Sequence, residues 1–239
     1  MNNTNLLSAP IRKPEEEIIE AAPSVSPLFR SFKFGSKRLA NRIVMAPMTR
    51  GQSPGGIPGA DVAAYYRRRA LGGVGLIITE GTHPGHPSCS GYPNVPFISG
   101  AEALAGWQKV VEAVHSADSV IIPQLWHTGS FCRPGFDRGH LIERLAPSSV
   151  PNPGLDRASA PVPKAMTNQD IATIIDAFAK AALDAQNIGF DGVEIHGAHG
   201  YLIDQFFWSL TNRRLDQYGG NLRQRTNFAV AIVKAIRKS

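Results

Sequence analysis

Apolar residues gather in four short continuous runs, and a stretch with helical spacing of apolar positions follows each run. The runs are residues 42–46, 75–79, 120–125 and 191–195. The stretches with helical spacing are residues 62–71, 101–116, 167–187 and 221–238. Continuous apolar runs of this length are typical of strands buried on both faces. The alternation therefore predicts an α/β protein with a parallel sheet covered by helices.

Residues with strong end preferences indicate where these helices begin and stop. Asp61 is the expected N-cap of the first helix, and the glycines at 72–73 are expected to end it. Thr167 and Asp170 fit a capping box at the start of the third helix, with Asp in the place of Glu. Gly189 is expected to stop that helix before the fourth apolar run begins.

Three segments fall outside the alternation of strands and helices, and the third predicted strand contains a proline. Residues 1–27 are rich in Pro, Ser, Asn and Glu and predict a flexible leader, followed by one domain over residues 28–239. Residues 28–40 alternate apolar and polar positions and predict a hairpin. The proline-rich insertion 129–166 has the length of a functional loop or lid. Pro123 lacks the N–H that a sheet needs, which predicts that the third strand is short or ends there.

Two architectures contain a parallel sheet with right-handed crossovers, the doubly wound open sheet and the (β/α)8 barrel. The first strand is not followed by the glycine-rich turn of a dinucleotide-binding unit. This absence argues against the doubly wound sheet. A barrel predicts polar, site-forming residues after each strand, at one face. Such residues follow all four strands: Thr49 and Arg50, then Glu80, then Gln124, Trp126 and His127, then His196, His199 and Tyr201.

Composition narrows the functional classes. The 239 residues are 43% hydrophobic, which suits a sizeable core, and the net charge is +6 with a pI of about 9.5. Basic residues are scattered apart from Arg67–Arg69, so nucleic-acid binding is not predicted. The two cysteines, Cys89 and Cys132, form no CxxC pair, so neither a disulfide framework nor a structural zinc site is expected. No signal peptide and no apolar run of ~18 residues is evident, which predicts a cytoplasmic protein without a membrane partner.

The fourth strand is followed by two imidazoles and a phenol within six positions. His196, His199 and Tyr201 indicate a site that binds an oxygen atom and moves a proton. Alternative interpretations remain at this point. The histidines could form a metal pair that lacks a third ligand or belong to a structural loop. Tyr201 could be a packing residue, Gln124 a satisfied core amide, and Thr49 a turn residue.

The strand ends together resemble those of the Old Yellow Enzyme family, which are FMN-dependent ene-reductases on a (β/α)8 barrel. The resemblance spans about residues 28–237. Its motifs are Asn41–Arg50 (NRIVMAPMTR), Thr79–Thr82 (TEGT), Gln124–Gly129 (QLWHTG) and His196–Phe206 (HGAHGYLIDQF), with Asn212, Arg213, Asp216, Tyr218, Gly219 and Gly220 after them.

The resemblance implies a flavin-binding role for five positions. Pro47, Met48 and Thr49 would lie along the edge of the flavin ring, with the Thr49 hydroxyl near O4 and N5. Gly81 would present its backbone to the pyrimidine, and Gln124 would present its amide to the N3 and O2 side. The implied cofactors are FMN and, as the reductant, NADPH or NADH.

The resemblance also implies how a substrate is held and reduced. His196 and His199 would bind the carbonyl or nitro oxygen of an activated alkene, Tyr201 would donate the proton, and Trp126 would shape the pocket. Hydride would pass from the nicotinamide to flavin N5 and then to the β-carbon. The imidazole N–H groups would stabilise the charge that grows on the oxygen. A phenol is protonated at neutral pH and suits proton delivery to the α-carbon.

The pattern departs from the family in its extent. Four strand–helix units are present, whereas a closed barrel has eight. The expected fold is therefore a (β/α)8 barrel truncated to about its first four units, with an N-terminal hairpin. The resemblance assigns no position to the arginine and the phosphate-binding loops of the family. An open inner face predicts self-association as a homo-oligomer. Two alternatives to an active ene-reductase remain. One is an inactive or partner-dependent half-barrel, and the other, among enzymes, is a dienoyl-CoA-reductase-like or amine-dehydrogenase-like relative.

Overall fold

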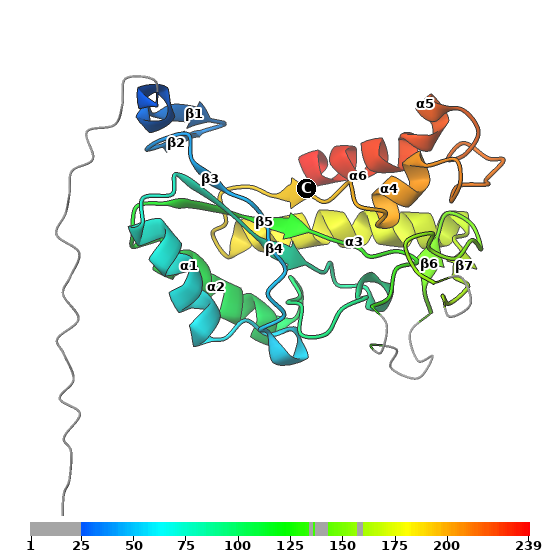
Figure 1. Cartoon of the computed structure of the whole chain (residues 1–239), viewed down its shortest axis with the longest axis horizontal. Helices are drawn as coiled ribbons and strands as arrows, with labels where there is room; N and C mark the ends of the chain where they lie inside the picture. Colours follow the sequence, from blue (N-terminus) through cyan, green and yellow to red (C-terminus); the bar gives the residue numbers. More distant parts are fainter. Residues whose placement is uncertain (1–24, 134–135, 137–142, 157–159) are drawn as a thin grey trace, which may run out of the picture.

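The computed structural model describes residues 25–133, 136, 143–156 and 160–239. The predicted leader lies outside the described residues except at its end. The centre of the fold is a parallel sheet in the order β3-β4-β5-β8 (Figure 1). Its strands are Val44–Met45, Leu76–Thr82, Val120–Leu125 and Glu194–Ile195. Each new strand adds to the same side of the sheet, as in a barrel, and the order does not reverse as in a doubly wound sheet.

Each strand of the sheet is followed by helical structure. The helices are α1 Ala60–Leu71, α2 Ala101–His115, α3 Asn168–Asn187, α4 Leu202–Phe207, α5 Leu222–Arg225 and α6 Asn227–Lys238. Helices α1 and α2 pack side by side, as do α3 and α6 (Figure 1). Two predictions were wrong in detail. The last predicted helix is divided at Thr226 into α5 and α6, and a further helix, α4, lies between the fourth apolar run and that helix, where the sequence predicted none.

The helix caps follow the predictions in part. The capping box at the start of α3 is confirmed, because the Thr167 hydroxyl accepts from Asp170 N at 3.1 Å and Asp170 Oδ2 accepts from Thr167 N at 2.8 Å. The prediction for α1 was wrong, since its N-cap is Gly59 and Asp61 lies in the first turn. A carboxylate there still favours the helix, because it faces the positive end of the helix dipole.

The two faces of the sheet have different partners. On the outer face, Ile77, Ile121 and Leu125 pack against the helices in the main core, whose largest fully buried side chains include Trp107 and Phe178. On the inner face, a second apolar cluster is made of Leu39, Leu76 and Ile122, with Ile78 and Val120 packed against it. Because side chains alternate along a strand, Gln124 shares the inner face with Val120 and Ile122.

Pro123 does not end its strand, contrary to the prediction. The register of β4 and β5 shifts at this point, from Ile78 opposite Ile122 to Gly81 opposite Gln124. The Thr79 hydroxyl lies in the shifted segment and accepts the N–H of Gln124 at 3.3 Å. A bulge thus accommodates the missing N–H of Pro123 and lets β5 continue to Leu125.

The two edge strands of the sheet, β3 and β8, are shorter and more exposed than the apolar runs predicted. Only Val44–Met45 of residues 42–46 forms a strand, and Val44 is 46% exposed. Only Glu194–Ile195 of residues 191–195 forms a strand, and both residues are partly buried. Within the described residues, β3 pairs only with β4 and β8 only with β5. An apolar run predicts burial, but an edge strand is covered on fewer sides.

The predicted hairpin is confirmed as β1 (Phe32–Phe34) paired antiparallel with β2 (Lys37–Leu39). It is joined to the sheet through Asp191, whose side chain is only 2% exposed. The carboxylate binds Lys37 Nζ at 2.8 Å, His115 Nε2 at 2.9 Å and the N–H of Ile121 at 2.9 Å. Burial alone would raise the pKa of Asp191, but these hydrogen bonds outweigh it and hold the pKa below its usual value.

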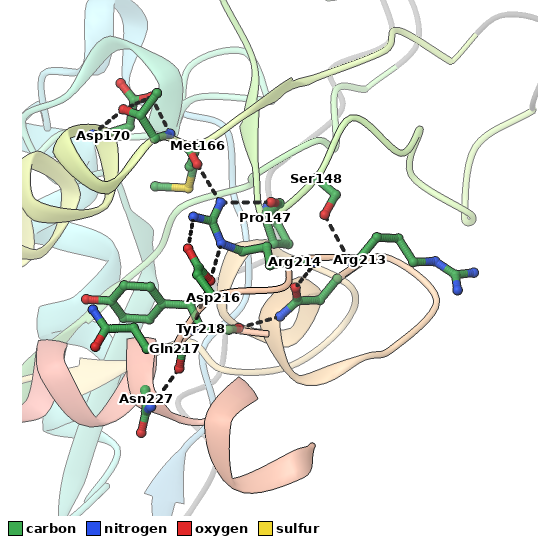
Figure 2. Close-up of polar contacts among 12 residues, drawn as sticks. Pro147, Ser148, Met166, Asp170, Arg213, Arg214, Asp216, Gln217, Tyr218 and Asn227 are labelled. Carbon is green, nitrogen blue, oxygen red and sulfur yellow. Dashed lines mark hydrogen bonds and ion pairs between the residues drawn. The ribbon is translucent and has the colours of Figure 1, made fainter. Parts of the chain in front are cut away.

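The long insertion contains β6 (Leu145–Ala146) and β7 (Lys164–Ala165), a parallel pair (Figure 1). Figure 2 shows how Arg214 holds it. The guanidinium donates to the carbonyls of Pro147 and Met166 and pairs with Asp216. One side chain therefore connects both strands of the insertion to the loop after α4.

Among the described residues, no helix is both long and apolar enough to span a membrane.

We predict that Asp191→Ala lowers the free energy of unfolding at pH 7 by about 1–3 kcal/mol, because the buried Ile121 N–H loses its acceptor. Because the folded pKa is depressed, this stabilisation is complete above the unfolded pKa of about 3.9 and is lost as the pH falls through the folded value. Chemical denaturation across pH measures both effects. The control is Asp176→Ala on the exposed face of α3, and equal losses in the two variants would contradict the prediction.

Candidate active site

The carboxyl ends of the strands lie at one edge of the sheet, where the predicted site residues meet. Backbone hydrogen bonds continue the ladder past the strand ends, from Trp126 N to Thr82 O at 2.8 Å and from His196 N to Leu125 O at 3.0 Å. Gly81 is directly opposite Gln124. Residues at or just past the carboxyl ends of β4, β5 and β8 are therefore neighbours, as parallel pairing requires.

His196, His199 and Tyr201 form one cluster with Trp126. The His196 ring centre lies 5.2 Å from that of His199, 5.0 Å from that of Tyr201 and 5.9 Å from that of Trp126. The Tyr201 ring meets the Trp126 ring edge-on at 4.9 Å. The structure thus brings together the four residues to which the sequence assigned substrate binding and proton donation.

The turn that presents this cluster has an unusual backbone. His199 has a φ of 61° and Gly200 a φ of 73°, and the left-handed region is uncommon for residues other than glycine. The turn is held by Asp204, whose carboxylate accepts the Gly200 N–H at 2.8 Å. Gln205 Nε2 donates to the Gly200 carbonyl at 2.7 Å. Tyr201 then begins α4 as its N-cap without using its side chain as a cap, which leaves the phenol free to face the cluster.

The protonation state of His196 follows from its surroundings. Burial, followed by the neighbouring His199, lowers the pKa of His196 to about 4, so the ring is neutral at pH 7. Its Nδ1 accepts the N–H of Ala198 at 3.3 Å. A neutral imidazole whose Nδ1 is an acceptor carries its proton on Nε2. His196 therefore offers one N–H donor to an oxygen atom.

Tyr201 is held by aromatic side chains from other segments. Phe131 meets its ring edge-on at 5.7 Å, and the Tyr92 hydroxyl lies 2.9 Å from the Tyr201 hydroxyl. Burial raises the pKa of Tyr201 above its ordinary value. The phenol is therefore protonated throughout the neutral range and can act as an acid.

Trp126 fixes the space around Gly81. A Cβ at position 81 would lie 2.3 Å from Trp126 Cε3, so no side chain fits unless the indole moves. Trp126 is 2% exposed, and its Nε1 has no hydrogen-bond partner among the described residues. The glycine is therefore explained by the close approach of this ring to the β4 backbone.

The segment after β3 presents Pro47, Met48 and Thr49. Met48 is 51% exposed and Thr49 is also exposed, while Pro47 is partly buried. The next residues are fixed by Glu80, which is 1% exposed and accepts the N–H groups of Arg50 at 2.9 Å and of Gly51 at 3.2 Å. Burial raises the pKa of this carboxyl group, partly offset by those two bonds. An apolar side chain and a hydroxyl thus remain available for a ligand on an anchored loop.

The amide of Gln124 is positioned by a residue from the neighbouring strand. Its Nε2 donates to Glu194 Oε1 at 2.7 Å. The Gln124 amide, the exposed Thr49 hydroxyl and the neutral His196 ring provide hydrogen-bonding groups, and Met48 provides an apolar one. Such a set suits a flat heteroaromatic ring with polar edges. The donor set therefore fits the ring portion of FMN. Within the described residues, no cluster of three metal-ligating side chains occurs.

Sequence reasoning missed three residues at this site. Tyr92 and Phe131 come from irregular loops, where no periodicity marks a side chain as inward-facing. Glu194 had a signal, since it is an acidic residue inside an apolar run. His127, one of the polar residues that follow the third strand, accepts from Gly129 N through Nδ1 and contacts the Ser88 hydroxyl through Nε2, so both of its ring nitrogens are engaged by these residues.

Comparisons with known proteins identify relatives. Residues 27–239 match the sequence model described as the NADH:flavin oxidoreductase / NADH oxidase family. The chain is 39% identical over 228 residues to 12-oxophytodienoate reductase 2 of Arabidopsis thaliana, covering 92% of this chain and 59% of that protein. It is 38% identical over 216 residues to 12-oxophytodienoate reductase 1 of Oryza sativa subsp. japonica, covering 90% and 56%.

The fold is similar to that of morphinone reductase in complex with tetrahydroNAD, with a TM-score of 0.80 and 35% identity over 88% of this chain and 60% of that one. The chain thus spans 56–60% of the length of these relatives. The resemblance to the Old Yellow Enzyme family and the partial (β/α)8 barrel are confirmed. At the level of the family, the comparisons also support FMN and NAD(P)H as cofactors.

We predict that Gly81→Ala destabilises the chain by about 1–3 kcal/mol, because the added methyl displaces the buried Trp126 ring. Chemical denaturation measures the loss, and intrinsic fluorescence reports the movement of the indole. The matched control is Gly192→Ala, whose Cβ would lie at an ordinary 3.5 Å from Ile122 Cγ2. The explanation for Gly81 fails if both variants have the stability and fluorescence of the original chain.

Proposed function

The chain belongs to the NADH:flavin oxidoreductase / NADH oxidase family, and from that premise we propose that its site reduces activated alkenes with FMN and NAD(P)H. The observation that carries the proposal is the cluster of two imidazoles and a phenol at the carboxyl edge of the sheet, with ring centres 5.0–5.2 Å apart from His196. The substrate class is an α,β-unsaturated carbonyl or nitro compound.

Five residues hold the cofactor in this proposal. Pro47 and Met48 pack against the ring of FMN, and the Thr49 hydroxyl and the Gln124 amide bind its polar edge. Gly81 allows Trp126 to approach the strand and contributes backbone polar groups. When bound, FMN supplies the hydride that it has received from NAD(P)H. Glu80 supports the site indirectly, since it anchors the two residues that follow Thr49.

His196 and His199 bind the oxygen of the substrate. As hydride adds to the β-carbon, negative charge grows on this oxygen, and fixed N–H donors stabilise it without having to reorient. Removing one such donor commonly slows turnover by about 10²–10³-fold. The low pKa of His196 keeps its ring neutral, so it acts as a hydrogen-bond donor and does not compete with Tyr201 as the acid.

Tyr201 donates a proton to the α-carbon. Its raised pKa ensures that the proton is present at neutral pH, and the charge developing on the substrate makes the transfer favourable. A positioned general acid typically contributes about 10²–10⁴-fold. Trp126, edge-on to Tyr201 at 4.9 Å, forms a wall of the pocket and keeps the phenol oriented.

A second candidate function is a half-barrel that acts only with a partner or is inactive. The observation in its favour is the exposed apolar surface along the β3 edge, where Val44 and Met48 are 46% and 51% exposed. The partner in this case is a second copy of the chain, since a homo-oligomer would cover the edge.

Purification in the presence of FMN separates the two functions. Retained flavin absorbance, together with NAD(P)H oxidation that depends on an added enone such as cyclohexenone, supports the ene-reductase. A colourless chain without enone-dependent oxidation overturns it and favours the second function. Sedimentation of the same sample tests whether activity belongs to a monomer or a homo-oligomer.

We predict that Tyr201→Phe in the flavin-loaded chain lowers enone reduction by about 10²–10⁴-fold, because the proton for the α-carbon is removed. Reduction of the flavin by NAD(P)H is expected to continue unchanged, since that half-reaction needs no proton from Tyr201. Stopped-flow absorbance measures the two half-reactions separately. Tyr218→Phe, which removes a phenol outside the cluster, is the control, and equal behaviour of the two variants would count against Tyr201 as the acid.

A further inference from the structure

Two tyrosine hydroxyls meet at the site, and one of them has no role in the proposed function. Tyr92 lies in the loop between β4 and α2, and Tyr201 lies 109 residues later, after β8. Their hydroxyl oxygens are 2.9 Å apart, and either can be the donor. Among the described residues, Tyr201 is the only hydrogen-bond partner of the Tyr92 hydroxyl.

The Tyr92 ring packs against two aromatic neighbours. It stacks on Phe131 with ring centres 5.2 Å apart and planes 17° apart, and it lies 5.1 Å from the Trp126 ring. The Tyr92 carbonyl accepts from the Ser90 hydroxyl at 3.3 Å. Aromatic stacking of this kind restricts the ring to one orientation, so the hydroxyl contact is supported by the packing around it.

Tyr92 also lines a second space. With Ser90, Asn94, Phe97 and other residues it borders a cavity of about 200 Å³. This volume is large enough for water, and the Ser and Asn side chains are polar groups that water could bind. Tyr92 therefore contacts the Tyr201 hydroxyl and also borders a space that solvent can occupy.

We propose that Tyr92 is a positioning residue that orients the Tyr201 hydroxyl and returns a proton to it after each turnover. This inference rests on the proposed function, in which Tyr201 is the acid. The Tyr201 O–H bond breaks as the C–H bond of the product forms. The Tyr92 O–H bond then breaks as that of Tyr201 re-forms, and Tyr92 takes a proton from water. One proton passes from water to the substrate anion, and no oxidant or reductant is consumed.

The surroundings of Tyr201 favour this route over direct return of a proton from a nearby acid. The rings that contact Tyr201 are Tyr92, Trp126, Phe131 and His196. Of these four side chains, only those of Tyr92 and His196 are chemically able to give a proton to a phenolate. His196 is neutral at pH 7, and in the proposed function its Nε2–H binds the substrate oxygen. Tyr92 is the remaining contact with a transferable proton.

The contact is tested first in the flavin-free full chain, which is independent of catalysis. Fluorotyrosine replaces the five tyrosines, so that the phenols ionise within a pH range that the fold tolerates. Each ¹⁹F resonance is assigned by one Tyr→Phe variant. After burial, the hydrogen bond to Tyr92 is the next cause of the raised pKa of Tyr201, because a hydroxyl that donates to a neighbour holds its proton more tightly. We therefore expect Tyr92→Phe to lower the pKa of Tyr201 by about one unit or more, as for coupled sites.

Two controls separate the hydroxyl from the packing. Tyr218→Phe removes a phenol elsewhere, and Phe131→Leu disturbs the stack while keeping both hydroxyls. Neither is expected to reproduce the shift of the Tyr201 ionisation. An unchanged or raised Tyr201 pKa in Tyr92→Phe overturns the proposal, as does an equal shift in Phe131→Leu.

The relay is tested in the flavin-loaded chain. We expect Tyr92→Phe to lower turnover at saturating enone by at least about tenfold, less than loss of the acid itself. The solvent deuterium isotope effect on turnover should increase, while flavin reduction by NAD(P)H stays the same. Unchanged turnover and isotope effect overturn the relay while the proposed function stands. Absence of enone reduction in the original chain overturns the proposed function, and the ¹⁹F titration still decides the contact.

Discussion

The register of β5 against its two neighbours is the constraint on which the rest of the structure depends. Parallel pairing with β4 places Gly81 opposite Gln124, and pairing with β8 places Gln124 opposite Glu194. Continuation of the same ladders brings Trp126 and His196 together. A slip of one residue would exchange the two faces of β5 and move Gln124 from the inner face to the helix-covered core. Register therefore determines both packing and the candidate chemistry.

The two ends of the sheet are stabilised by different interactions. At the amino end, the buried Asp191 carboxylate joins the hairpin, α2 and β5 through charged and backbone donors. At the carboxyl end, aromatic rings pack around Trp126, and burial keeps His196 neutral and Tyr201 protonated. The desolvation that packs these rings also sets the protonation states that the proposed reaction requires.

The family relationship extends over nearly the whole described chain, while the chain spans 56–60% of the length of the relatives compared. The described part holds the groups proposed for the substrate oxygen, the proton and the edge of the flavin ring. The exposed Val44 and Met48 at β3 belong to the same part. The surface that carries the chemistry and the surface open for association are thus neighbours at the β3 edge.

The sequence by itself determined the parallel α/β architecture, the α3 capping box and the cluster of His196, His199 and Tyr201. Such features are local, because periodicity marks the elements and parallel strands bring their carboxyl ends to one edge. Only the tertiary structure decided the exposure of β3, the bulge at Pro123, and the contacts of Asp191, Glu194 and Tyr92. The Tyr92–Tyr201 contact joins loops 109 residues apart, and pairs of that separation leave no periodic signal in the chain.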